Sequence, residues 1–335
     1  MQEYSKRLGP ISPQQFQAAL SRLRLGDFVT AEPVPFGLFG QNVFLTSTQG
    51  EFVFRGAPHY PWQFPTERFF VHQLHERTHA PVPYPYLLES SADIFGWSFV
   101  IMPRMPGVQL QDQDIAARLS FADRAALAQA LAGMLVEVQQ LTWAFAGQYD
   151  VELDGVKPLD QPYRAWIVER IRDKVQAAQS YNEHTTDGDV RWIESVIAQA
   201  RPMLRWPYKP CAVLGDYGEH NTVALRTAEG WRISGLFDLM TAHFGDGQAD
   251  LSLPVTTYLR EDERLADLFV AEYLRLKPMP PSFVAQQQLY MLDLTLSFWR
   301  HWQRNEGGIP GESKDLTFQR WARPAVDYWT KFAQN

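Results

Sequence analysis

The sequence predicts an α+β protein built from a small β-rich N-terminal lobe, residues 1–104, and a larger, mostly helical lobe, residues 105–335. Two observations support this prediction. Apolar residues alternate with polar ones in the first lobe, as in half-buried strands, whereas helical spacing dominates beyond about residue 108. The length of 335 residues is sufficient for two such lobes, each with a buried core.

The small lobe is predicted from four segments. Residues 11–27 form a helix that Ser12 caps and a glycine ends. Residues 38–55 alternate on both sides of the turn sequence STQG, which predicts a β-hairpin. Residues 66–78 have the pattern of a helix, and residues 97–105 that of a buried strand leading into a connector.

The larger lobe begins with a helical pattern that Ser120 caps and that continues to Leu141. Two further helical patterns start near residues 162 and 188, and aromatic-rich helical runs lead to the C-terminus. Residues 221–238 are the exception, because two apolar strand patterns flank the sequence RTAEG. They predict a hairpin embedded in the helical lobe.

Composition limits the classes of partner and the cellular location. The net charge of −7 argues against a general binder of nucleic acid or of anionic membranes, and slightly favours a cationic small molecule. Cys211 is the single cysteine, so neither an internal disulfide nor a cysteine-rich zinc site can form. The first residues lack the apolar run of a signal peptide, and no segment has the ~20 apolar residues of a membrane span. We therefore expect a cytoplasmic protein.

Acidic and amide side chains gather around the embedded hairpin. If Glu229 and Gly230 form the centre of its turn, Asn221 lies opposite Asp238, with Cβ atoms roughly 5 Å apart. Their oxygens are hard ligands of the kind that Mg²⁺ prefers. Asp216, on the loop before the hairpin, is then available to accept a proton from an attacking hydroxyl. Each of these residues alone is more often a turn former.

Two sequences in this region carry a family resemblance. LGDYGEHN, residues 214–221, and FDLMTAHFGDGQADL, residues 237–251, resemble the motifs of the aminoglycoside phosphotransferase and choline kinase family, the small-molecule branch of the protein-kinase-like fold. The resemblance implies a two-lobed protein-kinase-like fold. It also implies that Asp216 is the catalytic base, that Asn221 and Asp238 bind Mg²⁺, and that Asp250 braces the catalytic loop.

The resemblance extends into the small lobe. FGLFGQNVFL is similar to the family's glycine-containing nucleotide loop, EFVFRGAP to the strand with the phosphate-binding cation, and the next helix to the one bearing that cation's acidic partner. SFVIMPRMPG resembles the strand into the hinge, whose backbone meets adenine. The implied nucleotide-binding residues are Gly37, Gly40, Arg55, Glu67, Met102 and Arg104.

Three features depart from the family pattern. Leu214 replaces a usual histidine, Arg55 stands where most kinases have lysine, and the nucleotide loop lacks a full G-x-G-x-x-G. An arginine can still hold phosphate oxygens, because its planar guanidinium group can donate two parallel hydrogen bonds to them. The leucine is expected to change only the packing of the loop.

The resemblance implies an ATP- and Mg²⁺-dependent phosphotransferase that acts on a hydroxyl of a small molecule. An aminoglycoside, macrolide, choline-like amine, homoserine or sugar would all fit. The alternative is a catalytically silent, nucleotide-binding relative. Protein kinase activity is disfavoured, because the segment between Asp238 and Asp250 is short and lacks APE. A metal site formed by His72, His75 and His79 is also disfavoured, since no carboxylate group joins them.

Overall fold

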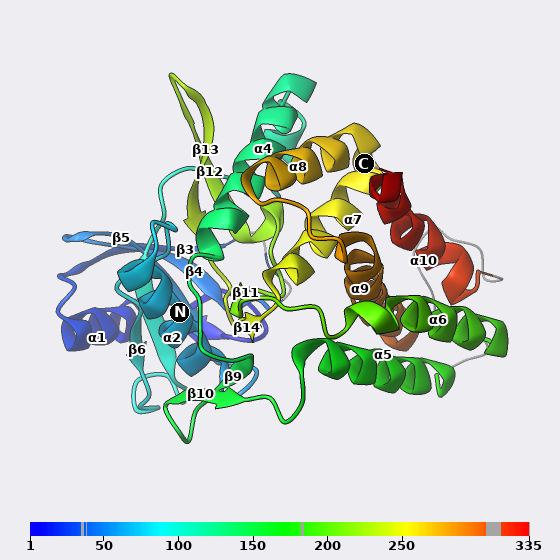
Figure 1. The fold of residues 1–335 in the computed structure, drawn as a ribbon. Helices are drawn as coiled ribbons and strands as arrows, with labels where there is room; N and C mark the ends of the chain where they lie inside the picture. Colours follow the sequence, from blue (N-terminus) through cyan, green and yellow to red (C-terminus); the bar gives the residue numbers. More distant parts are fainter. Residues whose placement is uncertain (35–36, 38, 182–183, 306–315, 335) are drawn as a thin grey trace. The chain divides into compact units, whose positions relative to one another are not determined.

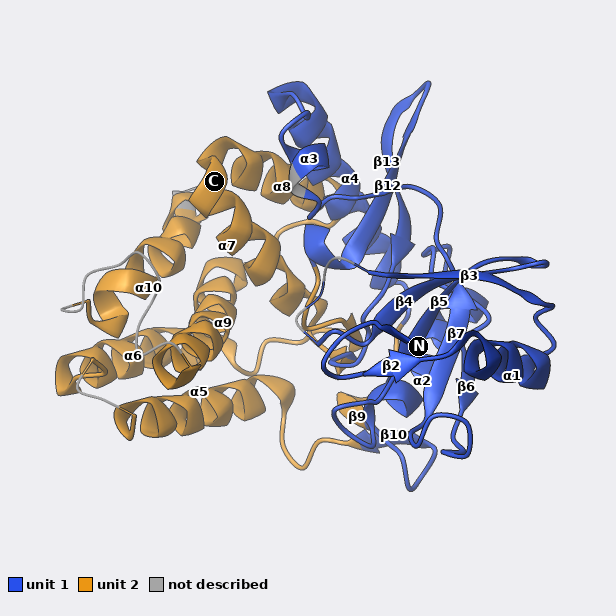
Figure 2. Ribbon diagram, turned by 180° about the vertical axis from the view of Figure 1, so that it is seen from behind, with its two compact units in different colours: residues 1–141, 149–157, 218–242 blue, residues 142–148, 158–217, 243–335 orange. Residues whose placement is uncertain are grey.

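The computed structural model describes residues 1–34, 37, 39–181, 184–305 and 316–334. The chain divides into two compact units (Figure 2). Unit 1 contains Met1–Leu141, Tyr149–Lys157 and Gly218–Ala242, and unit 2 contains Thr142–Gln148, Pro158–Tyr217 and His243–Asn335. These units do not follow the expected boundary at residue 104, because the chain returns twice to unit 1. The division into lobes at that residue stays a prediction.

A five-stranded antiparallel sheet forms the centre of unit 1. Its strand order is β3-β4-β5-β7-β6, and helices α1 and α2 belong to the same unit (Figure 1). The bounds are Phe28–Pro33 for β3, Asn42–Ser47 for β4, Gly50–Gly56 for β5, Leu87–Glu89 for β6, Phe99–Pro103 for β7, Pro13–Leu23 for α1 and Gln63–Arg77 for α2. A short pair, β1 (Gln2–Glu3) and β2 (Pro10–Ile11), precedes them.

Local sequence accounts for these elements. Ser12 caps α1 and exchanges hydrogen bonds with Gln15 in a capping box. Val43 and Leu45 of β4 are fully buried, while their neighbours are only partly buried, as the alternating pattern predicts. Both side chains pack into an apolar core with Phe16 of α1. The predicted helices, hairpin and buried strand of this region are therefore confirmed.

The embedded hairpin forms in unit 1, but its predicted register is wrong. Strands β12 (Thr222–Thr227) and β13 (Gly230–Leu236) pair Thr227 with Gly230, so Ala228 and Glu229 form the turn. A bulge at Ser234 then shifts the register, and the backbone N–H of Phe237 donates to the carbonyl of Asn221. Asn221 thus lies opposite Phe237 instead of Asp238.

The bulge has a tertiary cause. The Ser234 hydroxyl donates to the carbonyls of Pro106 and Val223, and β8 (Val108–Gln109) pairs with β12 as a third strand. Helices α3 (Gln113–Ala116) and α4 (Phe121–Val138) complete unit 1, with α4 packed against β13. Ser120 caps α4 as predicted.

Unit 2 is mainly helical. Its long helix α9 packs against α5, α6, α7 and α10, and β11 pairs antiparallel with β14. The bounds are Tyr163–Gln179 for α5, Asp187–Ala200 for α6, Cys211–Val213 for β11, His243–Gly245 for β14, Ser252–Glu261 for α7, Glu263–Leu276 for α8, Phe283–Asn305 for α9 and Phe318–Asp327 for α10. Strands β9 (Gly147–Asp150) and β10 (Gly155–Pro158) contain residues of both units. None of the described helices is long and apolar enough to cross a membrane.

Candidate active site

A buried ion pair joins the central sheet of unit 1 to helix α2. Arg55 is in β5, and its Nη1 lies 2.6 Å from Oε2 of Glu67 in α2. Their side chains are only 4% and 2% exposed. Tyr86 donates a second hydrogen bond to the same carboxylate oxygen, at 2.7 Å. The predicted pairing of Arg55 with Glu67 is therefore present in the structure.

Asp238 extends this pair into a cluster of three charges. Its Oδ1 lies 3.6 Å from Nη2 of Arg55, and its side chain is 25% exposed. The backbone of Asp238 has a φ of +61°, a left-handed conformation that is uncommon for a residue other than glycine. Strained conformations of this kind are often found at functional sites.

The cluster leaves several hydrogen-bonding positions open. Arg55 Nε, Glu67 Oε1 and Asp238 Oδ1 are buried atoms without a hydrogen-bond partner among the residues that the structure describes. Burial raises the pKa of Glu67 to about 7, against the opposing effect of the Arg55 charge. Buried polar atoms are usually partnered, and leaving one without a partner costs about 1–3 kcal/mol. The open positions therefore indicate a place for a polar ligand.

The two predicted metal ligands are both in unit 1. Asn221 ends a short 3₁₀ helix, η2 (Glu219–Asn221), and Asp238 follows β13. The backbone bond between Phe237 and Asn221 brings their chain segments together. One carboxylate and one amide oxygen suit Mg²⁺, which retains water and phosphate as its other ligands. Oδ1 of Asp238 accepts no hydrogen bond from the described residues, which is consistent with a metal ligand.

Of the three clustered histidines, His72 and His75 lie in α2, and His79 follows its end. Among the described residues, no group of three or more His, Cys, Asp and Glu side chains is arranged to hold a metal ion. The ring of His75 instead stacks on Tyr84, with centroids 3.8 Å apart.

The predicted nucleotide loop is described only in part. Gly37 and Gly40 both have positive φ, +109° and +55°, which the backbone of other residues rarely adopts. The hydroxyl of Ser5 donates to the carbonyl of Gly40. Phe36 and Leu38 of the same loop lie outside the described residues. A role of these glycines in nucleotide binding stays a prediction.

The predicted hinge follows the last strand pair of the unit 1 sheet. The first residue of β6, Leu87, pairs with Ile101 of β7. Met102 of β7 therefore lies beyond the part of the strand that pairs with β6. The guanidinium of Arg104 lies 3.9 Å from the centre of the Phe44 ring and 3.6 Å from the Glu51 carboxylate. Its side chain is thus engaged within the lobe. Any contact with adenine would come from the backbone, as the resemblance implies.

The predicted catalytic loop belongs to unit 2 up to Tyr217. The carboxylate of Asp250 accepts hydrogen bonds from the backbone N–H groups of Leu214 and Gly215, at 2.7 and 2.8 Å. These bonds hold the chain immediately before Asp216, whose side chain is half-buried. Because Asp216 is in unit 2 and the metal ligands are in unit 1, their convergence stays a prediction.

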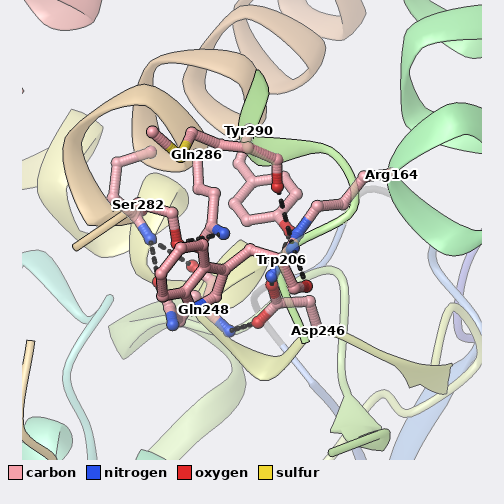
Figure 3. Close-up of polar contacts among 9 residues, drawn as sticks. Arg164, Trp206, Asp246, Gln248, Ser282, Gln286 and Tyr290 are labelled. Carbon is pink, nitrogen blue, oxygen red and sulfur yellow. Dashed lines mark hydrogen bonds and ion pairs between the residues drawn. The ribbon is translucent and has the colours of Figure 1, made fainter. Parts of the chain in front are cut away.

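A second buried arginine, which the sequence did not reveal, organises unit 2. Arg164 of α5 donates from Nη2 to Asp246 at 2.6 Å, and from Nη1 to the carbonyl of Trp206 at 2.5 Å (Figure 3). Tyr290 of α9 donates to the same oxygen of Asp246, at 2.7 Å. The network ties α5 and α9 to the loop before β11 and to the segment that carries Asp250.

A family model described as the phosphotransferase enzyme family matches residues 30–283, which is more than half of the chain. The protein therefore belongs to the phosphotransferase enzyme family. No curated protein matches the chain in sequence.

Solved structures show the same fold. A putative aminoglycoside phosphotransferase from Ralstonia eutropha has a TM-score of 0.63 at 16% identity, covering 97% of this chain and 99% of its own. Aminoglycoside phosphotransferase APH(4)-Ia, a D198A mutant with ADP and hygromycin B, has a TM-score of 0.63 at 16% identity, covering 95% and 98%. Choline kinase from Streptococcus pneumoniae has a TM-score of 0.57 at 11% identity, covering 93% and 98%. The predicted protein-kinase-like fold is thus confirmed.

Proposed function

We propose that this protein is an ATP- and Mg²⁺-dependent kinase that transfers the γ-phosphate to a hydroxyl group of a small molecule. The cluster of Arg55, Glu67 and Asp238 supports the proposal most strongly. Its Arg55–Glu67 ion pair is buried, while one polar atom of each of the three residues has no hydrogen-bond partner in the part of the chain that the structure describes. Family membership and the likeness to an ADP-bound structure agree with it.

Nucleotide binding is assigned to unit 1. Glu67 holds Arg55, and Tyr86 donates to the same carboxylate. Arg55 would donate a charge-assisted hydrogen bond to a phosphate oxygen, and its Nε has no hydrogen-bond partner among the described residues. Asp238 and Asn221 would hold Mg²⁺, which neutralises the charge of the phosphates when bound. Positioning and charge neutralisation account for most of the catalysis in phosphoryl transfer.

The transfer step is assigned to Asp216. The acceptor hydroxyl oxygen forms a bond to the γ-phosphorus as the bond from that phosphorus to the bridging oxygen breaks, and ADP leaves with the electron pair. Asp216 takes the hydroxyl proton. The hydrogen bonds from Leu214 and Gly215 to Asp250 keep the backbone before Asp216 in place.

The experiment that tests this function measures ATP consumption by the purified protein with Mg²⁺, across hydroxylated amines, sugars and antibiotics. Asp216→Ala is expected to leave nucleotide binding nearly unchanged and to lower transfer by ~10²- to 10⁴-fold, the range for a lost general base. Asp173→Ala is the matched control, because Asp173 is an exposed aspartate of α5 in the same unit. It should retain full activity.

The outcomes separate the two candidate functions. Turnover that one acceptor stimulates and that Asp216→Ala removes supports the kinase. ATP binding without stimulated turnover across the acceptor set would favour the catalytically silent alternative. Absence of ATP binding in the presence of Mg²⁺ contradicts both, since each requires the nucleotide site of unit 1.

A further inference from the structure

A cavity lies against the outward face of α2, within unit 1. Its volume is about 460 Å³, and none of the residues proposed above to bind nucleotide or to act in transfer lines it. The side chains that carry the argument are Arg68, Phe69, His72, Tyr84, Tyr86 and Tyr149. Arg68 directly follows Glu67 in the chain, so the cavity and the ion pair use neighbouring residues of one helix.

Aromatic rings form the walls of this cavity. Phe69 stacks on Tyr149 with ring centroids 4.8 Å apart and planes 29° apart. On another side, His72 lies 6.1 Å from the ring of Tyr84. These contacts hold the rings in place, and each ring can still meet a planar ligand with its edge or its second face. The cavity is large enough for one small molecule of this shape.

Arg68 supplies a positive charge at the same cavity. Burial and a hydrogen bond to Asp154 raise the pKa of Tyr149, whereas the charge of Arg68 and a hydrogen bond from it lower that pKa. Asp154 also lines the cavity, and the Tyr149 hydroxyl donates to its carboxylate at 2.6 Å, which holds that carboxylate beside Tyr149. A guanidinium has five N–H donors, and the contact with Tyr149 leaves donors for a carboxylate.

We infer that this cavity binds a small planar aromatic carboxylate, with its ring against Phe69, Tyr84 and Tyr149 and its carboxylate on Arg68. The site is separate from the proposed catalytic residues. Both required features, aromatic rings and the guanidinium of Arg68, line this partly open cavity.

Tyr86 connects the cavity to the ion pair. Its ring lines the cavity, and its buried hydroxyl donates to Glu67, which holds Arg55. A ligand that binds this arrangement stabilises the conformation in which Arg55 is held in place, so it should raise nucleotide affinity. By reciprocity, nucleotide raises the affinity for the carboxylate by the same factor. This coupling rests on the proposed nucleotide site, whereas carboxylate binding does not.

The test titrates the full chain with benzoate, 4-hydroxybenzoate and indole-3-carboxylate by ligand-detected NMR, with 4-hydroxybenzamide as the uncharged control. We expect saturable binding of at least one carboxylate at millimolar concentration and much weaker binding of the amide. Arg68→Gln should lower the affinity for the carboxylate at least 10-fold. Arg77→Gln, an exposed position on the same helix, should leave it unchanged. Binding by none of the three carboxylates, or binding that Arg68→Gln does not weaken, overturns the site.

The coupling is measured separately, as the affinity for an ATP analogue and Mg²⁺ with and without the bound carboxylate. An increase of about 5-fold or more is expected, the lower end of typical allosteric coupling. Tyr86→Phe keeps the ring but removes the bond to Glu67, so the carboxylate should still bind while the increase disappears. If the native protein binds the ATP analogue equally well with and without the carboxylate, the coupling is overturned, but the carboxylate site is not. Absence of nucleotide binding without any carboxylate would count against the proposed function instead.

Discussion

The two units each contain a buried arginine paired with a carboxylate, but the two pairs differ in completeness. In unit 2, the guanidinium of Arg164 donates from Nε, Nη1 and Nη2, and its acceptors are a carboxylate, a tyrosine hydroxyl and two backbone carbonyls. In unit 1, Arg55 Nε has no hydrogen-bond partner among the described residues, and Glu67 Oε1 has none either. Both arginines are almost fully buried.

This difference separates a network that is complete within the protein from one that a ligand could complete. Burying a charge is costly unless hydrogen bonds satisfy it, and the Arg164 network meets this condition within the protein. The Arg55 cluster does not, so a ligand could complete it. Ion-pair distance and burial alone would not distinguish the two, since both pairs are separated by 2.6 Å.

The largest effect is expected where the network is complete. Arg164→Met leaves Asp246 as a buried carboxylate without its counter-charge, so the free energy of unfolding should fall by about 3–5 kcal/mol. Denaturant unfolding monitored by tryptophan fluorescence measures this loss. Arg172→Met is the matched control on the same helix, because the pair of Arg172 with Glu194 is exposed and should contribute at most about 1 kcal/mol. If both variants lost the same free energy of unfolding, the structural role of Arg164 would be contradicted.

A smaller effect, of a different kind, is expected in unit 1. Arg55→Met should weaken binding of an ATP analogue with Mg²⁺ by ~10- to 100-fold, as expected for lost hydrogen bonds between charged groups worth about 1.5–3 kcal/mol. Unfolding should be affected less than in Arg164→Met, because Glu67 can take up a proton and retains its bond to Tyr86.

Calorimetric titration of folded protein measures this change in nucleotide affinity. Arg22→Met is the control, since Arg22 forms an exposed ion pair with Asp93 elsewhere in unit 1. Unchanged nucleotide affinity in Arg55→Met would refute the binding role and leave both arginines as structural.

The third effect depends on pH and concerns Lys174, a buried cation that can lose its proton. Burial lowers its pKa to about 8 from an ordinary value of 10.5, against the attraction of Asp293. Between these two values the unfolded chain binds more protons than the folded one, so stability rises with pH across this window. Relative to Lys174→Met, the native protein should gain up to about 3 kcal/mol between pH 8 and 10.5, because a pKa difference of one unit corresponds to about 1.4 kcal/mol. A difference that stays constant with pH, in unfolding experiments on both proteins, would contradict this.

Much of the fold could be predicted because its signals are local. The Ser12 and Ser120 capping boxes, and the alternation in β4, depend on residues only a few positions apart. Short-range hydrogen bonds and the periodicity of side chains determine such elements. The pairing of Arg55 with Glu67 came from a family resemblance, and the structure shows Asp238 as a third charge beside this pair.

Only the tertiary structure decided the register of the embedded hairpin and the partners of the buried charges. The sequence predicts a hairpin between residues 221 and 238, but the bulge at Ser234 depends on hydrogen bonds to Pro106 and Val223. Likewise, Tyr86 reaches Glu67 from nineteen positions away, and Tyr290 reaches Asp246 from forty-four. Local patterns cannot specify such contacts, because they depend on which distant segments pack together and on which polar groups that packing removes from water.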